Sequence, residues 1–184
     1  AGLTYYFSAM EEMGKQQKTL NVVKDKYDCV VRIKPEEKNI FLVFTADSMF
    51  QGGEAILKTL KKNKIKGSFF FTGNALRMEE HKDIIEKIIK DEHYVGGHSD
   101  SHMLYAGWDN RDSLIVTYAQ IEDDIIANAR ELEKFGITKE KSLWFLPPYE
   151  YYNDESVRIT ESLGYKVLNY TPGTSTPADY TTPS

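Results

Sequence analysis

The stretch IFLVFTAD, residues 40–47, decides the fold class of this chain. Its first five residues are all apolar, which predicts a strand buried on both faces of a parallel sheet. The run stops at the carboxylate of Asp47, and a glycine pair and a helical pattern follow it. A buried strand with a polar residue at its carboxyl end is where α/β proteins place functional groups.

The same alternation of apolar strand and amphipathic helix continues along the chain. We expect an earlier strand over 29–33, and further strands over 67–72, 94–97, 142–146 and 165–170. The helical periodicity predicts helices over 54–64, 79–91, 117–135 and 154–163. This order predicts an α/β fold with a parallel sheet and a barrel-like closure.

Composition limits the possible functions. The 184 residues correspond to one domain or most of one, and 41% are hydrophobic, which is enough for a substantial core. The net charge is −5 without a long basic tract, so we expect no nucleic-acid partner. Cys29 is the only cysteine, which excludes an intrachain disulfide and a cysteine-based zinc site. The sequence has no apolar run long enough to span a membrane.

Residues 98–102 read HSDSH and place two histidines four positions apart. His98 and His102 can point to one side of a helical turn, and a carboxylate from another segment, Asp47, can complete a three-ligand face. Such nitrogen and oxygen ligands suit a zinc-like metal with an open position for water. The alternatives are two histidines without a metal and an Asp47 that only caps the turn after it.

Three polar or proline-rich segments follow predicted strands, and we expect them at one edge of the sheet. They are Asp47, His98 and the sequence Pro147-Pro148-Tyr149. The ordered set VFTAD (43–47), KGSFFFTG (66–73), GHSDSH (97–102) and FLPPY (145–149) resembles the motifs of the polysaccharide deacetylases, also called the NodB-homology or carbohydrate esterase family 4 domain. The resemblance covers about residues 40–170.

The resemblance implies a distorted (β/α) barrel that removes N- or O-linked acetyl groups from glycans such as chitin, peptidoglycan or xylan. It implies a divalent metal held by Asp47, His98 and His102, with zinc preferred and cobalt, nickel or iron possible. The backbone N–H of Tyr149 would help to stabilise the oxyanion. Polymeric substrates of this kind imply a secreted or periplasmic protein.

The sequence departs from the family pattern at three points. Ala46 stands where the family has its general base, and Leu146 stands where it has the arginine that orients that base. A late motif with the histidine that acts as general acid is missing, because no histidine follows His102. We therefore expect a barrel that is incomplete at the C-terminus, with residues 1–27 as an unassigned extension and 28–184 as the deacetylase-like domain.

A missing base would cost about 10²–10⁴ in rate. We interpret Glu150 as a substitute base, although an exposed loop carboxylate is the simpler reading of that residue. Asp100, the rival candidate, is expected to point away from the metal or to cap its turn.

Aromatic residues around the proline motif are candidates for contact with sugars. Pro148, Tyr149, Tyr151 and Trp108 could line a substrate groove, or the rings could pack under loops instead. Trp144 is expected in the core. The two remaining histidines, His81 and His93, flank a helix and are predicted to be exposed to solvent.

These observations lead to three hypotheses. The first is a metal-dependent hydrolase that removes acetyl groups from a polysaccharide or oligosaccharide. The second is a catalytically inactive relative that binds acetylated glycans in the same groove, which the residues Ala46 and Leu146 favour. The third is a structural α/β domain of a larger protein. The sequence leaves the oligomeric state, the particular sugar and the particular metal open.

Overall fold

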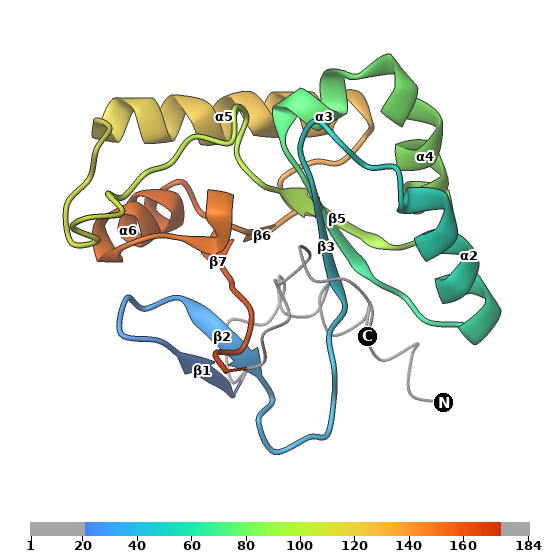
Figure 1. Cartoon of the computed structure of the whole chain (residues 1–184), viewed down its shortest axis with the longest axis horizontal. Coiled ribbons are helices and arrows are strands. Elements are labelled where there is room, and N and C mark those ends of the chain that lie inside the picture. The colour runs from blue at the N-terminus through green and yellow to red at the C-terminus, as the bar shows by residue number, and fades with distance from the viewer. Residues whose placement is uncertain (1–20, 174–184) are drawn as a thin grey trace.

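Five parallel strands form the central sheet of this computed structural model, which describes residues 21–173 (Figure 1). Their order across the sheet is their order in the sequence: β3 (Val43–Ala46), β4 (Ser68–Phe71), β5 (Tyr94–Gly97), β6 (Trp144–Phe145) and β7 (Lys166–Val167). Every adjacent pair runs parallel. The predicted α/β class with parallel strands is confirmed, and within the described residues the strands form an open sheet rather than a closed barrel.

Helices connect these strands, as parallel pairing requires. They are α2 (Gly53–Asn63), α3 (Gly73–Arg77), α4 (Glu79–Lys90), α5 (Tyr118–Lys134) and α6 (Asp154–Ser162), with a short 3₁₀ helix η1 (Pro148–Glu150). The four predicted helices all form, with ends within one residue of the prediction. In α5, the Thr117 hydroxyl accepts from the Gln120 N–H while the Gln120 side chain accepts from the Thr117 N–H. This reciprocal capping explains why the helix begins there.

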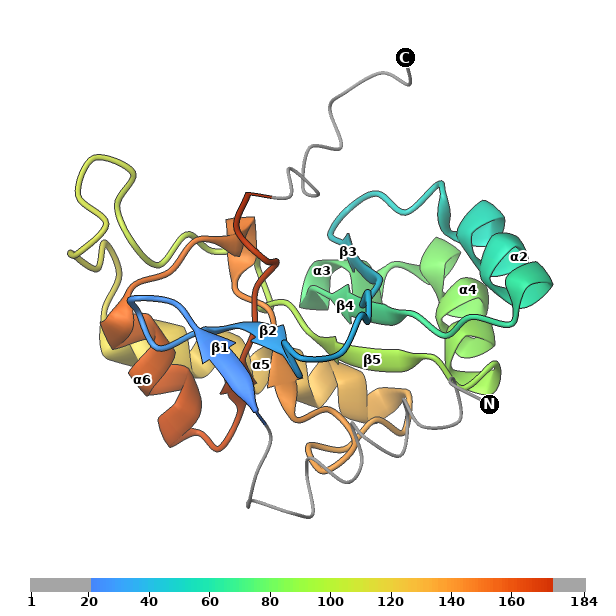
Figure 2. The same cartoon turned by 90° about the horizontal axis from the view of Figure 1, so that it is seen from below.

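A second, antiparallel sheet pairs β1 (Val22–Lys24) with β2 (Val30–Ile33). Val30 makes a parallel bridge to Leu168 just beyond β7, and its oxygen accepts from the Asn169 N–H at 2.9 Å. The hairpin therefore lies against the β7 side of the central sheet (Figure 2). The predicted extension over residues 1–27 thus includes β1, while residues 1–20 lie outside the described part of the chain.

The core lies on both faces of the sheet, because successive side chains of a strand point to opposite sides. Phe69 and Phe71 pack toward α2 and α4, whereas Phe70 joins Trp144 and Leu146 on the other face. Each phenylalanine of this run is fully buried, which contributes about 2–3 kcal/mol per side chain. Trp144 is in the core, as predicted.

The prediction of a strand over 40–44, buried on both faces, is wrong. β3 begins at Val43, and Ile40 and Val43 are 86% and 40% exposed. The reason is the position of β3 at the end of the five-stranded order, where it has one strand neighbour, β4, among the described residues. Its apolar composition resembles that of a central strand, although its place in the sheet is at an edge.

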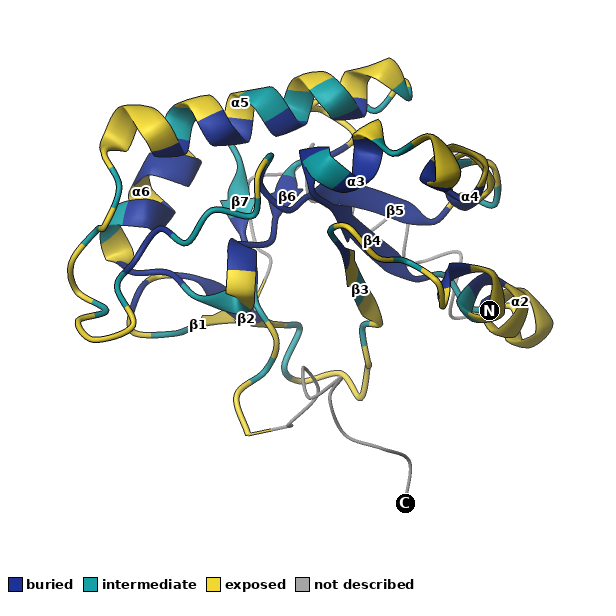
Figure 3. Cartoon of the chain, turned by 45° about the horizontal axis from the view of Figure 1, so that its top comes forward, coloured by how far each residue is buried: buried dark blue, intermediate teal, exposed yellow. Residues whose placement is uncertain are grey.

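The prediction that His81 and His93 are exposed is also wrong, because both are only 6% exposed. Buried and exposed residues alternate along α4, on which His81 lies (Figure 3). His81 continues the buried stripe of α4, three positions before Ile84. The His93 ring packs edge-on against Phe69, and its Nδ1 accepts from the Gly67 N–H at 3.1 Å.

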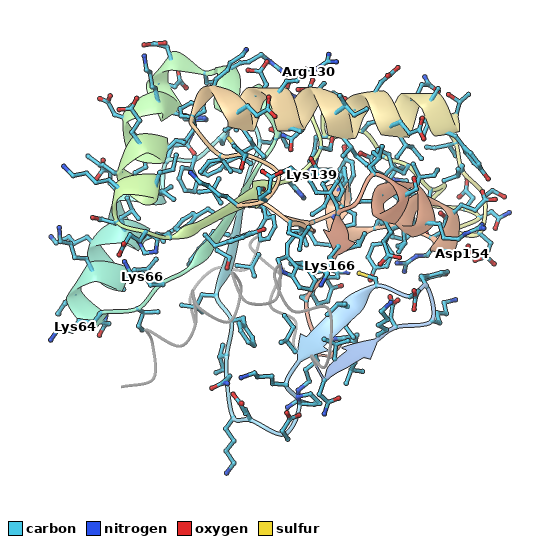
Figure 4. All side chains as sticks on the ribbon, turned by 180° about the vertical axis from the view of Figure 1, so that it is seen from behind. Lys64, Lys66, Arg130, Lys139, Asp154 and Lys166 are labelled. Atoms are coloured by element: carbon cyan, nitrogen blue, oxygen red, sulfur yellow. The ribbon has the colours of Figure 1, made fainter. Side chains whose placement is uncertain are left out.

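Charged side chains occupy the outer surface, as on α5 and α6, where Arg130 and Asp154 are exposed (Figure 4). None of the helices in residues 21–173 combines the length and apolar character needed to cross a bilayer.

Candidate functional site

Asp47 follows β3 directly, and two side chains from the next strand end hold its carboxylate. The Thr72 hydroxyl donates to Oδ1 at 2.8 Å, and Nδ2 of Asn74 donates to the same oxygen at 3.2 Å. Burial opposes ionisation of Asp47, but these hydrogen bonds outweigh it and hold its pKa below the usual value. Asp47 is therefore an anion at neutral pH. Thr72 and Asn74 were missed in the sequence, although Thr72 is also the N-cap of α3, a position that threonine favours.

His98 follows β5 and is 2% exposed. Its Nδ1 lies 2.8 Å from the backbone oxygen of Leu146, which follows β6. Because a carbonyl oxygen can only accept, Nδ1 carries the proton and Nε2 keeps its lone pair. Burial lowers the pKa of His98 to about 4, so the ring is neutral at pH 7.

His102 lies beside His98, and the two Nε2 atoms are 3.2 Å apart. Burial lowers the pKa of His102 also, against the opposing effect of the Asp47 carboxylate. Two neutral rings with facing nitrogens need something between them, which is a proton donated by His102 or a cation bound by both. Asp47 is close enough to both rings to influence their charge.

The charge states of the three side chains fit a divalent metal. Two neutral imidazoles and one ionised carboxylate are the forms in which these groups bind metal ions. The hydrogen bond from Nδ1 of His98 to a carbonyl is a common support for a metal-binding histidine. Within residues 21–173, however, no three His, Cys, Asp or Glu side chains are already arranged so that they could hold an ion between them. The chemistry of the donors fits, and the predicted ligand set stays a prediction.

The loop that carries both histidines is fastened to the start of α3. The backbone N–H groups of Gly73 and Asn74 donate to the oxygens of Ser99 and Asp100, both at 3.0 Å. The Arg77 guanidinium binds the Asp100 carboxylate through two nitrogens, at 2.6 and 3.2 Å. A Cβ at Gly73 would collide with that carboxylate, so the close approach requires glycine. Asp100 is thus paired with Arg77, and its exclusion as a base stays a prediction.

A buried carboxylate on α5 fixes the other end of the loop. Oδ1 of Asp124 accepts from the Ser101 N–H at 3.0 Å and from the Ser101 hydroxyl at 2.9 Å, and Oδ2 accepts from the Tyr105 hydroxyl at 2.7 Å. Burial and the nearby Asp124 raise the pKa of Tyr105, so the phenol remains a donor. This role of Asp124 was not predicted, because in the sequence Asp124 is one of several acidic residues on a predicted helix.

Backbone strain accumulates around these residues. Ser99, His102, Tyr149 and Glu150 have φ values of 72°, 56°, 59° and 51°, in the left-handed region that non-glycine residues rarely adopt. Such conformations cost about 1–3 kcal/mol each and persist only where the surroundings impose them. Four further non-glycine residues of the described part of the chain share this conformation elsewhere in the fold, namely Asp28, Lys34, Lys64 and Glu92, so the strain alone does not single out this edge.

The two positions at which we expect a departure from the family pattern are buried. Ala46 is 3% exposed and packs in the apolar cluster of Phe69 and Phe71. Leu146 is 3% exposed and packs in the separate cluster on the other face of the sheet. Leu146 nevertheless serves the site through its backbone oxygen, the acceptor for His98.

The proline segment brings an aromatic surface to the histidines. The Tyr149 ring lies 4.3 Å from the His102 ring, centroid to centroid, and Trp108 contacts Tyr149 at 5.8 Å and Tyr151 at 4.3 Å. Pro148 is buried beneath this surface as the first residue of η1. The N–H of Tyr149 lies in the first turn of η1, where amides have no acceptor within the helix, which suits the predicted oxyanion donor. Glu150 is half-buried, and its backbone oxygen accepts from Asn169.

The strand ends therefore assemble a histidine pair, an ionised aspartate and an aromatic rim at one edge of an α/β sheet. The family model of the polysaccharide deacetylases matches residues 32–168, and the chain belongs to that family. It is 28% identical over 159 residues to the peptidoglycan-N-acetylmuramic acid deacetylase PdaA of Bacillus subtilis. That match covers 85% of this chain and 54% of PdaA, so the chain spans about half the length of this relative.

Solved structures give the same result. Wild-type BA3943 of Bacillus anthracis, described as a pseudoenzyme of the CE4 family, is 25% identical with a TM-score of 0.54, over 72% of this chain and 44% of that chain. A BA3943 mutant described as having restored enzymatic activity is 26% identical with a TM-score of 0.55, over 72% and 46%. A family 4 carbohydrate esterase of Bacillus anthracis has a TM-score of 0.62 over 92% and 69% of the two chains, and at 20% identity it supports the fold alone.

Proposed function

We propose that this chain is a metal-dependent hydrolase that removes N- or O-linked acetyl groups from a polysaccharide or oligosaccharide. The observation that carries the proposal is the pair of neutral imidazoles, the buried His98 and the half-buried His102, with their Nε2 atoms 3.2 Å apart near the ionised Asp47. Asp47, His98 and His102 would hold a divalent metal, with zinc preferred over cobalt, nickel or iron. Bound there, the metal would supply polarisation of the acetyl carbonyl and a water of lowered pKa.

The chain's own residues would do the rest. The Tyr149 N–H would donate to the oxyanion, and Glu150 would take the proton from the attacking water in place of the carboxylate absent at position 46. Pro148, Tyr149, Tyr151 and Trp108 would contact the glycan. Action on polymeric glycans would place the protein outside the cytoplasm, secreted or periplasmic.

A second candidate is an inactive domain that binds acetylated glycans in the same groove. Alanine at position 46 and leucine at 146 support it, and so does the similarity to a relative described as a pseudoenzyme. Both candidates predict binding of the glycan, but only the first predicts release of acetate.

Metal analysis of the whole chain, combined with acetate release from acetylated chitooligosaccharides, peptidoglycan strands and acetylxylan, separates the two candidates. The hydrolase requires one bound metal per chain and acetate from at least one substrate. Bound metal without acetate from any of them would favour the inactive binder. A chain that takes up no zinc, cobalt, nickel or iron would contradict the proposed metal site.

A further inference from the structure

The loop between β5 and α5 carries an exposed tryptophan. Trp108 is 59% exposed, whereas the other tryptophan of the chain, Trp144, is 1% exposed. The loop projects at the end of the molecule opposite α2 (Figure 2). An exposed aromatic side chain on such a projection is available for contact with a ligand.

Contacts at the base and at the tip of the loop fix the position of Trp108. Ala106 bridges to Leu114 in antiparallel fashion, which closes the base of the loop. At its tip, the Arg111 guanidinium lies 4.4 Å from the ring centres of Tyr27 and Tyr151. These cation–π contacts anchor the loop to the rest of the protein.

The anchor also involves a third tyrosine. The Arg111 guanidinium lies 5.0 Å from the Tyr152 ring, and its Nε donates to the Tyr152 backbone oxygen at 2.6 Å. Tyr151 supports the same loop a second time, because its hydroxyl donates to the Gly107 oxygen at 3.2 Å. The position of Trp108 is therefore fixed before any ligand arrives, which reduces the entropy lost on binding.

The tryptophan is continuous with the candidate site. Its ring is tilted by 40° against the ring of Tyr151, and 59% of the residue nevertheless stays exposed to solvent. Tyr149 touches both Trp108 and His102, and it is the single ring between the tryptophan and the histidine pair. Two exposed polar residues, Asp109 and Asn110, follow Trp108 in the chain, and the Asn110 side chain binds Ser113 and Asp112 within the loop.

We propose that Trp108 is a separate subsite that stacks one sugar ring of a glycan chain while a neighbouring sugar presents its acetyl group to His98 and His102. The C–H groups of a pyranose face complement the negative face of an indole. The ligand is a chain of at least two sugars, because Tyr149 separates the subsite from the histidines. The inference rests on the proposed function for the second sugar, but the stacking itself needs no turnover.

The test measures binding of glycans from one to six sugars by calorimetry, with chitooligosaccharides in acetylated and deacetylated form, muropeptide-derived strands and xylooligosaccharides. Trp108→Ala is expected to weaken binding of the longer chains about 5- to 30-fold, the loss of one aromatic contact. It should leave monosaccharide binding unchanged. Ile115→Ala is the matched control, because Ile115 is 57% exposed on the same loop.

Two results separate this inference from the proposed function. Loss of binding in Trp108→Ala with no acetate released by the wild type supports the subsite and contradicts the hydrolase. Acetate release with equal affinity and equal KM in the wild type and Trp108→Ala for every chain length overturns the subsite. If acetate is released, the subsite further requires a higher KM for long chains with an unchanged kcat.

Discussion

Nδ1 of His98 lies 2.8 Å from the backbone oxygen of Leu146, so the end of β6 determines which nitrogen of this histidine faces His102. The contact does not depend on the side chain at position 146. An uncharged side chain at this position, such as leucine, therefore still leaves His98 its backbone acceptor.

Replacement of His102 tests the metal site with little disturbance of the backbone. His102→Asn should reduce zinc affinity by more than the roughly 10- to 100-fold that the loss of a supporting contact costs, because it removes a direct ligand. Asparagine tolerates the left-handed conformation that position 102 requires. Competition with a chromophoric chelator measures the affinity, and an unchanged melting temperature of the metal-free variant serves as the control. Equal zinc affinity would exclude His102 as a ligand.

The Thr72 hydroxyl makes two hydrogen bonds, and one pair of variants tests both. It donates to Asp47 and accepts from the Ala75 N–H at 3.1 Å as the N-cap of α3. Thr72→Val should lower the free energy of unfolding by about 1–2 kcal/mol and weaken zinc binding about 10- to 100-fold. Thr72→Ser keeps the hydroxyl and should stay close to wild type. Urea unfolding measures the stability and competition with a chelator measures the zinc affinity. Equal stability and equal zinc affinity of the two variants would contradict both roles of the hydroxyl.

Glu150 is proposed as the substitute base. In a chain that releases acetate, Glu150→Gln should lower kcat by about 10²–10⁴ and leave KM nearly unchanged, because a general base acts on the transition state. Glu161→Gln, on the exposed part of α6, provides the control. Acetate release at the wild-type rate would assign the base to another group.

His93 should make stability depend on pH. Burial, followed by the positive charge of Lys66, lowers its pKa in the folded protein. Below about pH 6.5 the unfolded chain takes up a proton that the folded chain resists, so the free energy of unfolding should fall as the pH falls. In His93→Asn, whose side-chain oxygen can still accept from the Gly67 N–H, this fall between about pH 7.5 and pH 5 should be smaller. Urea titrations at several pH values measure the free energy of unfolding of both proteins. The same dependence on pH in the wild type and in His93→Asn would contradict the role of His93.

The sequence predicted the long helices well because their apolar periodicity and capping residues agree with one another. The Thr117 cap and the stripe of α4 are examples. The edge position of β3 could not be predicted from the sequence, because the composition of a strand does not show which strands lie beside it. His81 could have been recognised as buried from its spacing to Ile84. The five-residue α3 was not predicted, because it is too short to show an apolar periodicity, and the N-cap role of Thr72 was missed with it.

The site was predicted in part. Asp47, His98 and His102 were predicted as a ligand set from the residue types and their places after strands. The structure pairs the two histidine rings, and the ligand set itself stays a prediction. Their supports were not predictable, because a backbone carbonyl such as that of Leu146 has no signature in a sequence. The aromatic rim was predicted by residue type, but the anchoring of its loop by Arg111 depends on tertiary contacts.

The bridge between Val30 and Leu168 has a consequence for how the protein is made. The Tyr152 hydroxyl donates to Asp25 across 127 positions, and the Thr171 hydroxyl donates to Val31 across 140. Contacts of such separation delay folding, because the chain loses much entropy before they form. On the ribosome, the two histidines leave long before the oxygen that orients His98, which is 48 positions later. A nascent chain therefore carries its candidate ligands exposed and unsupported until almost all of the described segment has been synthesised.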